Sequence, residues 1–142
     1  MASSILLEVV SPNGAVCAKD ISMLIVRSTG GELGILPRHA PLITGLVPHA
    51  MRVKVQNQEE LIACAGGFME VTPKKITVLA NAAEEAGNID VNRAQQAYSR
   101  AKARIEEFKR APKEHEDIDI DRAELALARA KARLLATNTS FN

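Results

Sequence analysis

Glycine and proline are confined almost entirely to the first part of this sequence. All eight glycines lie before residue 88, and five of the six prolines lie there too, the sixth being Pro112. The remaining residues are rich in alanine, arginine and lysine, which favour helices, whereas crowded turn-forming residues favour short strands. The boundary near Gly87-Asn88 therefore predicts a β domain at 1–87 and a helical part at 88–142.

The first part is organised as short apolar segments separated by turns. Its alternating valines at 51–56 have the period of a strand with one buried face. The predicted strands are 6–10, 15–19, 22–28, 51–56, 61–65, 68–72 and 75–80. Short strands with regular turns favour a sandwich or barrel over a fold with crossover helices, and we expect a two-layer β-sandwich. Only 3% of residues are aromatic, so valine, isoleucine and leucine must fill the layer between the sheets.

One segment fits neither a regular strand nor a tight turn. Residues 31–42 contain two glycines and two prolines, which are incompatible with a helix or a central strand. Four apolar residues in the same segment indicate an ordered loop anchored to the core. His39 has no second histidine, cysteine or aspartate at ligand spacing, so local packing or hydrogen bonding is favoured over a metal or catalytic role.

The helical part contains an internal repeat. Residues 89–105 and 118–134 share the pattern I-D-x-x-R-A-x-x-A-x-x-R-A-K-A-R-[I/L]. Asp90 and Asp119 stand where an N-cap is expected, because a carboxylate there accepts hydrogen bonds from the free amides of the first turn. Ala111-Pro112 ends the first helix, and residues 113–117 form a short polar link. The repeat therefore predicts an antiparallel α-helical hairpin.

Each predicted helix carries a narrow apolar stripe with heptad-like spacing. The stripes are Ala94, Tyr98, Ala101, Ile105 and Phe108 in the first helix, and Ile120, Ala123, Leu127, Ala130 and Leu134 in the second. Alanine lets the helices approach closely, but it removes little apolar area from water, at about 25 cal/mol per Å². The hypothesis that follows is a hairpin with a thin seam, able to detach from the surface on which it rests.

Arginines repeat beside the stripes and allow two interpretations. They are Arg93, Arg100 and Arg104 in the first helix and Arg122, Arg129 and Arg133 in the second. Either they are solvated and pair with nearby carboxylates such as Glu106 and Glu107, or they converge on an anion, for which guanidinium groups are suited. Nucleic acid is a poor candidate, because the formal net charge is only +1 and the helical aromatics lie on the apolar stripes.

Several classes of protein are disfavoured. Cys17 and Cys64 lie in apolar segments without metal-ligand spacing, so we expect two reduced, buried, structural thiols. No apolar run approaches the ~18 residues of a membrane span, and no secretion signal is expected. His39, His49 and His115 have no nucleophile or base at useful spacing, which argues against a stand-alone enzyme.

Four motifs follow one another along the chain. They are G-E-L-G-I-L-P with H-A-P-L at 31–42, G-G-F-M-E-V at 66–71, V-L-A at 78–80, and the D-x-x-R-A helix starts. In this order they resemble the epsilon-subunit family of bacterial F-type ATP synthases over nearly the whole chain. The resemblance implies a sandwich that binds the gamma subunit and rests on the c-ring through a loop containing Glu32, Arg38 and His39. Arg38 departs from the family, which usually has glycine there.

The same resemblance implies a mobile hairpin with two states. Folded on the sandwich, it leaves the enzyme free; extended along gamma into the head of beta and alpha subunits, it blocks rotation in the hydrolysis direction. In some bacterial members the folded state binds ATP, with or without Mg, and the matching residues here are Glu84, Ile89, Asp90, Arg93, Arg100, Arg129 and Arg133. The sequence has no glycine-rich phosphate loop, so this would be a regulatory site without catalytic residues or metal ligands.

The resulting prediction is a non-catalytic subunit that requires no cofactor and takes ATP only as a regulatory ligand. Its place would be peripheral, on the cytoplasmic side of the cell membrane, with the membrane contacted only through the complex. The alternative that stays open is a sugar- or peptide-binding β-sandwich adaptor with an unrelated helical tail.

Overall fold

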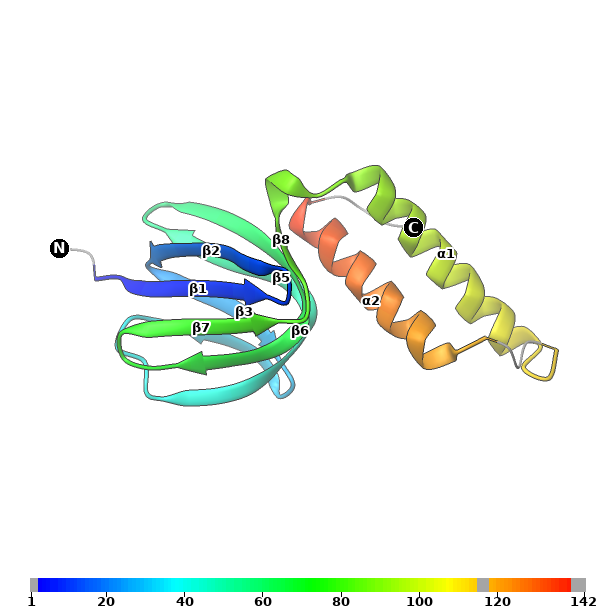
Figure 1. Ribbon diagram of the computed structural model, residues 1–142, viewed down its shortest axis with the longest axis horizontal. Coiled ribbons are helices and arrows are strands. Elements are labelled where there is room, and N and C mark those ends of the chain that lie inside the picture. The colour runs from blue at the N-terminus through cyan, green and yellow to red at the C-terminus, as the bar shows by residue number, and fades with distance from the viewer. Residues whose placement is uncertain (1–2, 115–117, 139–142) are drawn as a thin grey trace.

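Figure 1 shows a computed structural model in which a β-sandwich is followed by two antiparallel helices, as predicted. The structure describes residues 3–114 and 118–138, so His115 and part of the predicted link 113–117 lie outside the described residues. The strands are β1 (Ile5–Ser11), β2 (Gly14–Ile21), β3 (Met23–Ser28), β4 (Gly31–Ile35), β5 (Leu42–Val55), β6 (Gln58–Val71), β7 (Lys75–Ala80) and β8 (Ala83–Glu85). A 3-10 turn, η1 (Ala86–Asn88), leads to α1 (Val91–Arg110) and α2 (Ile120–Ala136).

The strands follow the order β2-β1-β7-β6-β5-β3-β4, and β8 pairs with β6. Neighbouring strands are antiparallel except β1 and β7, which run parallel. β6 pairs with β8 through its first half, at 62–64, and with β7 through its second half, at 67–71. The long β5–β6 hairpin curves along the side of the sandwich that faces the helices (Figure 1).

Aliphatic side chains fill the space between the layers. Alternate residues of β1 and β7 are buried, the pattern of strands with one face in a core. Among the described residues, the core cluster contains no aromatic ring and is built from side chains such as Leu7, Val9, Leu24, Ile35, Val53, Met69, Ile76 and Val78. This arrangement confirms the expectation that branched aliphatic residues, not aromatics, form the layer.

β6 runs without a break through Gly66-Gly67, where the sequence predicted two separate strands. That prediction was wrong because the two glycines adopt positive φ, 87° and 136°, at the point where β6 leaves β8 and joins β7. A Cβ atom on Gly67 would overlap the carbonyl oxygen of Leu79 and lie 3.0 Å from Cα of Ala80. Glycine is therefore required for the crossing and does not end the strand.

β5 begins nine residues earlier than the predicted strand 51–56, at Leu42. The added part of the strand contains Pro48, and proline cannot donate a ladder hydrogen bond. In the structure Pro48 pairs with Ala65 of β6, while β3 has no register partner in β5 between Leu46 and Arg52. The proline therefore lies where β5 is bonded on one side only.

The segment 31–42 is only partly a loop. Its first five residues form β4, which pairs with β3 at the edge of the sheet, so the expectation of a loop there was wrong. The strand begins at Gly31, whose φ of 121° suits the turn that joins β3 to β4. The remaining residues before β5 form an irregular connection, in which Arg38 has a left-handed φ of 65°.

α2 lies between the sandwich and α1, contacting β5 and β6 on one side and α1 on the other (Figure 1). Its seam with α1 uses the predicted stripes, with one buried cluster made of Ala94, Tyr98, Ala130 and Leu134. A second face of α2 packs on the sandwich, where Ala136 is 1% exposed and contacts the cluster of Ala50 and Ala63. The buried residues of that cluster are alanines, so the helix approaches the sheet closely but buries little area.

Candidate functional site

The predicted ATP-binding residues gather around a groove where α1 begins, α2 ends and β8 passes. We call it the proximal groove; its volume is about 480 Å³ and its lining is Glu84, Asn88, Asp90, Arg93, Ala94, Ala97, Arg100 and Arg133. Five of the seven predicted residues line it, and they come from β8, from the residue before α1, and from both helices. The sandwich therefore contributes one wall of the groove, at Glu84, and this wall is present only while the hairpin rests on the sandwich.

Asp90 fixes the start of α1 and, with it, the first arginine of the groove. Its Oδ1 accepts a hydrogen bond from the backbone N–H of Arg93 at 3.1 Å, which confirms the predicted N-cap. Asp119 makes the equivalent 3.1 Å bond with Arg122 at the start of α2. Arg100 follows Arg93 by two helical turns, so both guanidinium groups belong to one side of α1.

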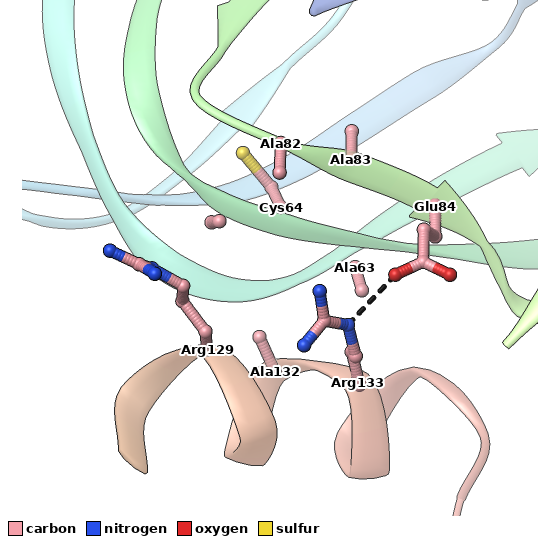
Figure 2. Close-up of a pocket in the computed structure, with 9 residues that line it drawn as sticks. Ala63, Cys64, Ala82, Ala83, Glu84, Arg129, Ala132 and Arg133 are labelled. Atoms are coloured by element: carbon pink, nitrogen blue, oxygen red, sulfur yellow. Dashed lines mark hydrogen bonds and ion pairs between the residues drawn. The ribbon is translucent and has the colours of Figure 1, made fainter. Parts of the chain in front are cut away.

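Glu84 and Arg133 join the sandwich to α2. Nε of Arg133 donates to Oε1 of Glu84 at 2.8 Å, and the two side chains are 34% and 38% exposed. The dashed line in Figure 2 marks this pair. A pair this exposed contributes at most about 1 kcal/mol to stability, because water screens it. Its main effect is orientation: it directs the guanidinium of Arg133 toward β8 and holds the wall of the groove in place.

Two of the predicted residues do not line the groove. Arg129 borders a much smaller space of about 10 Å³ beneath α2, and its guanidinium points away from Glu84 in Figure 2. Ile89 is half-buried against the alanine cluster under the end of α2. Their assignment to ATP binding stays a prediction; in the structure Ile89 anchors the connection between sandwich and hairpin.

The charges of the proximal groove favour a small anion. Arg93 and Arg100 form no ion pair with any described residue, including Glu106 and Glu107. The carboxylate of Asp90 accepts from its own helix, and that of Glu84 accepts from Arg133. Two guanidinium groups are thus left to donate to a phosphate or carboxylate, for which their planar forks are suited.

The loop residues Glu32, Arg38 and His39 each contact a different part of the chain. Glu32 belongs to β4 and forms an exposed ion pair of 3.7 Å with Arg27. The backbone N–H of Arg38 donates to the carbonyl of Pro73 at 3.3 Å, which ties the loop to the β6–β7 turn. Nδ1 of His39 lies 2.7 Å from the carbonyl oxygen of Ala40, a local hydrogen bond. The left-handed φ of Arg38 is a conformation that glycine adopts freely.

An exposed apolar patch on the sandwich was missed by sequence reasoning. Ile43, Phe68 and Leu79 are 73%, 63% and 57% exposed on three adjacent strands, and Phe68 pairs directly with Leu79. They border a hollow of about 180 Å³. In β6 and β7, large apolar residues occupy consecutive positions, as at Phe68 and Met69 or at Val78 and Leu79. Because consecutive side chains of a strand point to opposite faces, one residue of each pair must face outward, and this signal was present in the sequence.

Other candidate chemistry is weak in the described part of the chain. Burial raises the pKa of the Cys64 thiol, and of the Cys17 thiol, which keeps both protonated at neutral pH. Cys17 is only half-buried, so the expectation that both thiols are buried was wrong for it. Within residues 3–114 and 118–138, no three His, Cys, Asp or Glu side chains gather to hold a metal ion. Neither described helix is long and apolar enough to cross a membrane.

Comparisons with known proteins agree with these features. Residues 4–86 match the family model of the ATP synthase delta/epsilon chain beta-sandwich domain, and residues 88–138 match that of its long alpha-helix domain. The ATP synthase epsilon chain of Alkalihalophilus pseudofirmus is 48% identical over 107 residues, covering 75% of this chain and 80% of that one. That of Pelotomaculum thermopropionicum is 50% identical over 99 residues, covering 70% and 74%.

A chain in the Euglena gracilis mitochondrial ATP synthase, solved as OSCP/F1/c-ring in rotational state 1, has the same fold. Its TM-score is 0.75 at 20% identity, and the match covers 95% of this chain and 81% of that chain. The helical part is not an unrelated tail, as the adaptor alternative required, because it matches the same family as the sandwich. The chain belongs to the ATP synthase delta/epsilon chain family.

Proposed function

We propose that this chain is the epsilon subunit of an F-type ATP synthase and connects the gamma subunit to the c-ring in the central stalk. The observation that carries the proposal is that sandwich and hairpin match two domains of one family, with relatives called ATP synthase epsilon chain at 48% and 50% identity. Such a subunit is non-catalytic and peripheral, on the cytoplasmic side of the cell membrane, with the membrane contacted only through the complex.

The apolar patch of Ile43, Phe68 and Leu79 is the surface that we assign to gamma. Large side chains gathered on an outer sheet face are typical of a protein interface. The hollow between them can accept a side chain of the partner. The connection around Arg38 and His39, with Leu36 55% exposed beside them, is assigned to the c-ring.

Replacing Phe68 with aspartate should abolish stable association with gamma. Loss of an aromatic anchor costs about 2 kcal/mol or more, roughly 30-fold in affinity, and a charge in the patch adds a desolvation penalty. Co-purification with gamma measures the effect, and Leu36→Asp is the matched control, since it places the same charge at another exposed apolar site. Equal gamma binding by both variants would remove the patch from the proposal.

The hairpin is proposed as a movable brake that ATP holds in its folded position. The proximal groove takes walls from the sandwich and from both helices, so a ligand there binds only the folded state. Ligand binding stabilises that state by RT ln(1 + [L]/Kd), which lowers the population of the extended state that inhibits hydrolysis. Mg would accompany ATP through the phosphates, since the described residues supply no metal cluster.

The variant Arg93→Ala should weaken ATP binding to the isolated chain about tenfold or more. A charge-assisted hydrogen bond contributes about 1.5–3 kcal/mol. Arg93 forms no ion pair with a described residue, so its removal leaves no carboxylate of the protein without a partner. Calorimetric titration measures the change, and Arg129→Ala tests whether Arg129 turns toward the ligand. Lys109→Ala on the exposed end of α1 is the charge control. Absence of heat with the unaltered chain at millimolar ATP would reject the ATP site.

A further inference from the structure

A second groove lies between the two helices, farther from the sandwich. We call it the distal groove; its volume is about 600 Å³ and its lining is Ala97, Arg100, Ala101, Arg104, Glu107, Ile118, Asp119, Arg122, Ala123 and Ala126. All of these residues belong to α1, to α2 or to the residues directly before α2. Unlike the proximal groove, it needs no wall from the sandwich.

The distal groove is the counterpart of the proximal groove under the internal repeat. Because the hairpin is antiparallel, an approximate two-fold axis between the helices places equivalent residues at opposite ends of one face. The pairs that line the two grooves are Asp90 with Asp119, Arg93 with Arg122, Ala94 with Ala123, Ala97 with Ala126, and Arg133 with Arg104. The duplicated sequence has therefore produced two grooves whose linings correspond at five pairs of positions, although Arg129, the repeat counterpart of Arg100, lines neither.

Three arginines line the distal groove. Arg100, Arg104 and Arg122 form no ion pair within residues 3–114 and 118–138. Arg100 and Arg104 stand four residues apart on α1, a spacing at which like charges destabilise a helix. Of the two carboxylates in the lining, Asp119 accepts from the N–H of Arg122 as a cap. The other carboxylate, Glu107, forms no ion pair with a described residue, so the lining holds three arginines and two carboxylates. An excess of positive charge in a concave site stabilises a bound polyanion.

The floor of the groove leaves room for such a ligand. Four of its lining residues are alanines, whose short side chains do not fill the space between the arginines. The lining of the groove contains no aromatic ring on which a base could stack, and Tyr98 is buried in the helix seam. The recognised chemistry is thus anionic and not aromatic.

We propose that the distal groove binds a phosphoanhydride chain, supplied either by inorganic pyrophosphate or by the phosphates of a nucleotide. The site is additional to the proposed ATP site and does not depend on it, although Arg100 lines both grooves. Because its walls are the two helices alone, the ligand stabilises the hairpin seam whether or not α2 rests on the sandwich.

Titration of the full chain with pyrophosphate, followed by calorimetry and by amide chemical shifts, tests the proposal. The unaltered chain should show shifts around both grooves. Arg122→Gln should weaken the distal event about fivefold or more and leave the proximal shifts in place, since removal of one charge-assisted contact has at least that effect. Arg93→Gln should do the reverse, and Lys109→Gln, outside both grooves, should change neither.

Three results would overturn the distal site: pyrophosphate shifts confined to the proximal groove, equal weakening by Arg122→Gln and Lys109→Gln, or no binding at millimolar pyrophosphate. Parallel titrations with ADP and adenosine show whether a nucleotide can supply the phosphoanhydride chain and whether its phosphates are the part that binds. If ADP perturbs the distal groove and pyrophosphate does so too, the phosphates are the recognised part; distal binding of adenosine alone contradicts the proposal. Failure of ATP binding in the proximal groove leaves the Arg122 comparison intact, so the two proposals fail separately.

Discussion

Replacing Ala136 with glutamate should detach the helical hairpin from the sandwich. Ala136 is 1% exposed and lies against Ala50 and Ala63, with Leu61 and Ile89 packed around them. A carboxylate in this apolar contact lacks hydrogen-bond donors and costs about 3 kcal/mol, which shifts the docking equilibrium about 100-fold. The sandwich core and the Ala94–Leu134 cluster are separate from this contact, so both parts should stay folded.

Amide hydrogen exchange across α1 and α2 measures the detachment. Without the support of the sandwich, the thin alanine seam should open more often, so exchange should quicken throughout both helices in Ala136→Glu and stay at its original rate in β1 and β7. The matched control is Ala103→Glu, which adds the same charge at an exposed position of α1. If the two variants exchange equally, the alanine contact is not what holds the hairpin.

The same variant tests the proposed brake in the assembled enzyme. A hairpin released from the sandwich spends more time extended, so hydrolysis by the reconstituted head should fall below that with the unaltered subunit. Removal of residues 89–142 should abolish this effect, because the inhibiting segment is then absent. Quickened exchange with unchanged hydrolysis would mean that the hairpin is mobile but has no inhibitory role.

Replacing Gly67 with alanine should prevent the sandwich from folding normally. Gly67 has a φ of 136°, which alanine rarely adopts, and its Cβ would overlap the carbonyl oxygen of Leu79. The backbone of β6 is bonded to β5 on one side and β7 on the other, so it cannot move aside without breaking pairs at Leu46 or Ala80. We expect a loss of about 3 kcal/mol or more in the free energy of unfolding.

Urea unfolding followed by circular dichroism measures this loss, and thermal unfolding should show a midpoint lower by about 15 °C. Gly30→Ala is the matched control, since Gly30 has no positive φ and its Cβ would meet only the hydroxyl of Ser28, at 3.8 Å. A Gly67→Ala midpoint within a few degrees of the Gly30→Ala midpoint would show that β6 can cross from β8 to β7 by another path.

The sequence predicted most of the hairpin because its signals are local. Asp90 and Asp119 cap the helices as expected, and Ala111 follows the last residue of α1. The apolar period identified the seam through Tyr98 and Leu134. Such features depend on residues three to seven positions apart, so the chain itself contains the information.

Strand boundaries were predicted less well because a glycine or proline can either end a strand or be accommodated within it, depending on its position in the sheet. Gly67 permits a crossing between two neighbours, Pro48 lies opposite a gap in β3, and the glycines of β4 are accommodated at a sheet edge. In each case the neighbouring strand decides whether the residue ends the element. That neighbour is distant in the chain and is not visible in the local pattern.

The candidate site was likewise predictable from the sequence only in part. The sequence by itself determined that two equivalent arginine-bearing helices exist, and the resemblance supplied seven residues for ATP. Only the tertiary structure decided that Glu84, Asp90, Arg93, Arg100 and Arg133 share one groove while Arg129 lies under α2 and Ile89 in an apolar contact. The second face of α2, the patch at Phe68 and the distal groove likewise appeared only on folding. The physical reason is that each combines side chains from separate elements, whose packing, rather than any local period, brings them together.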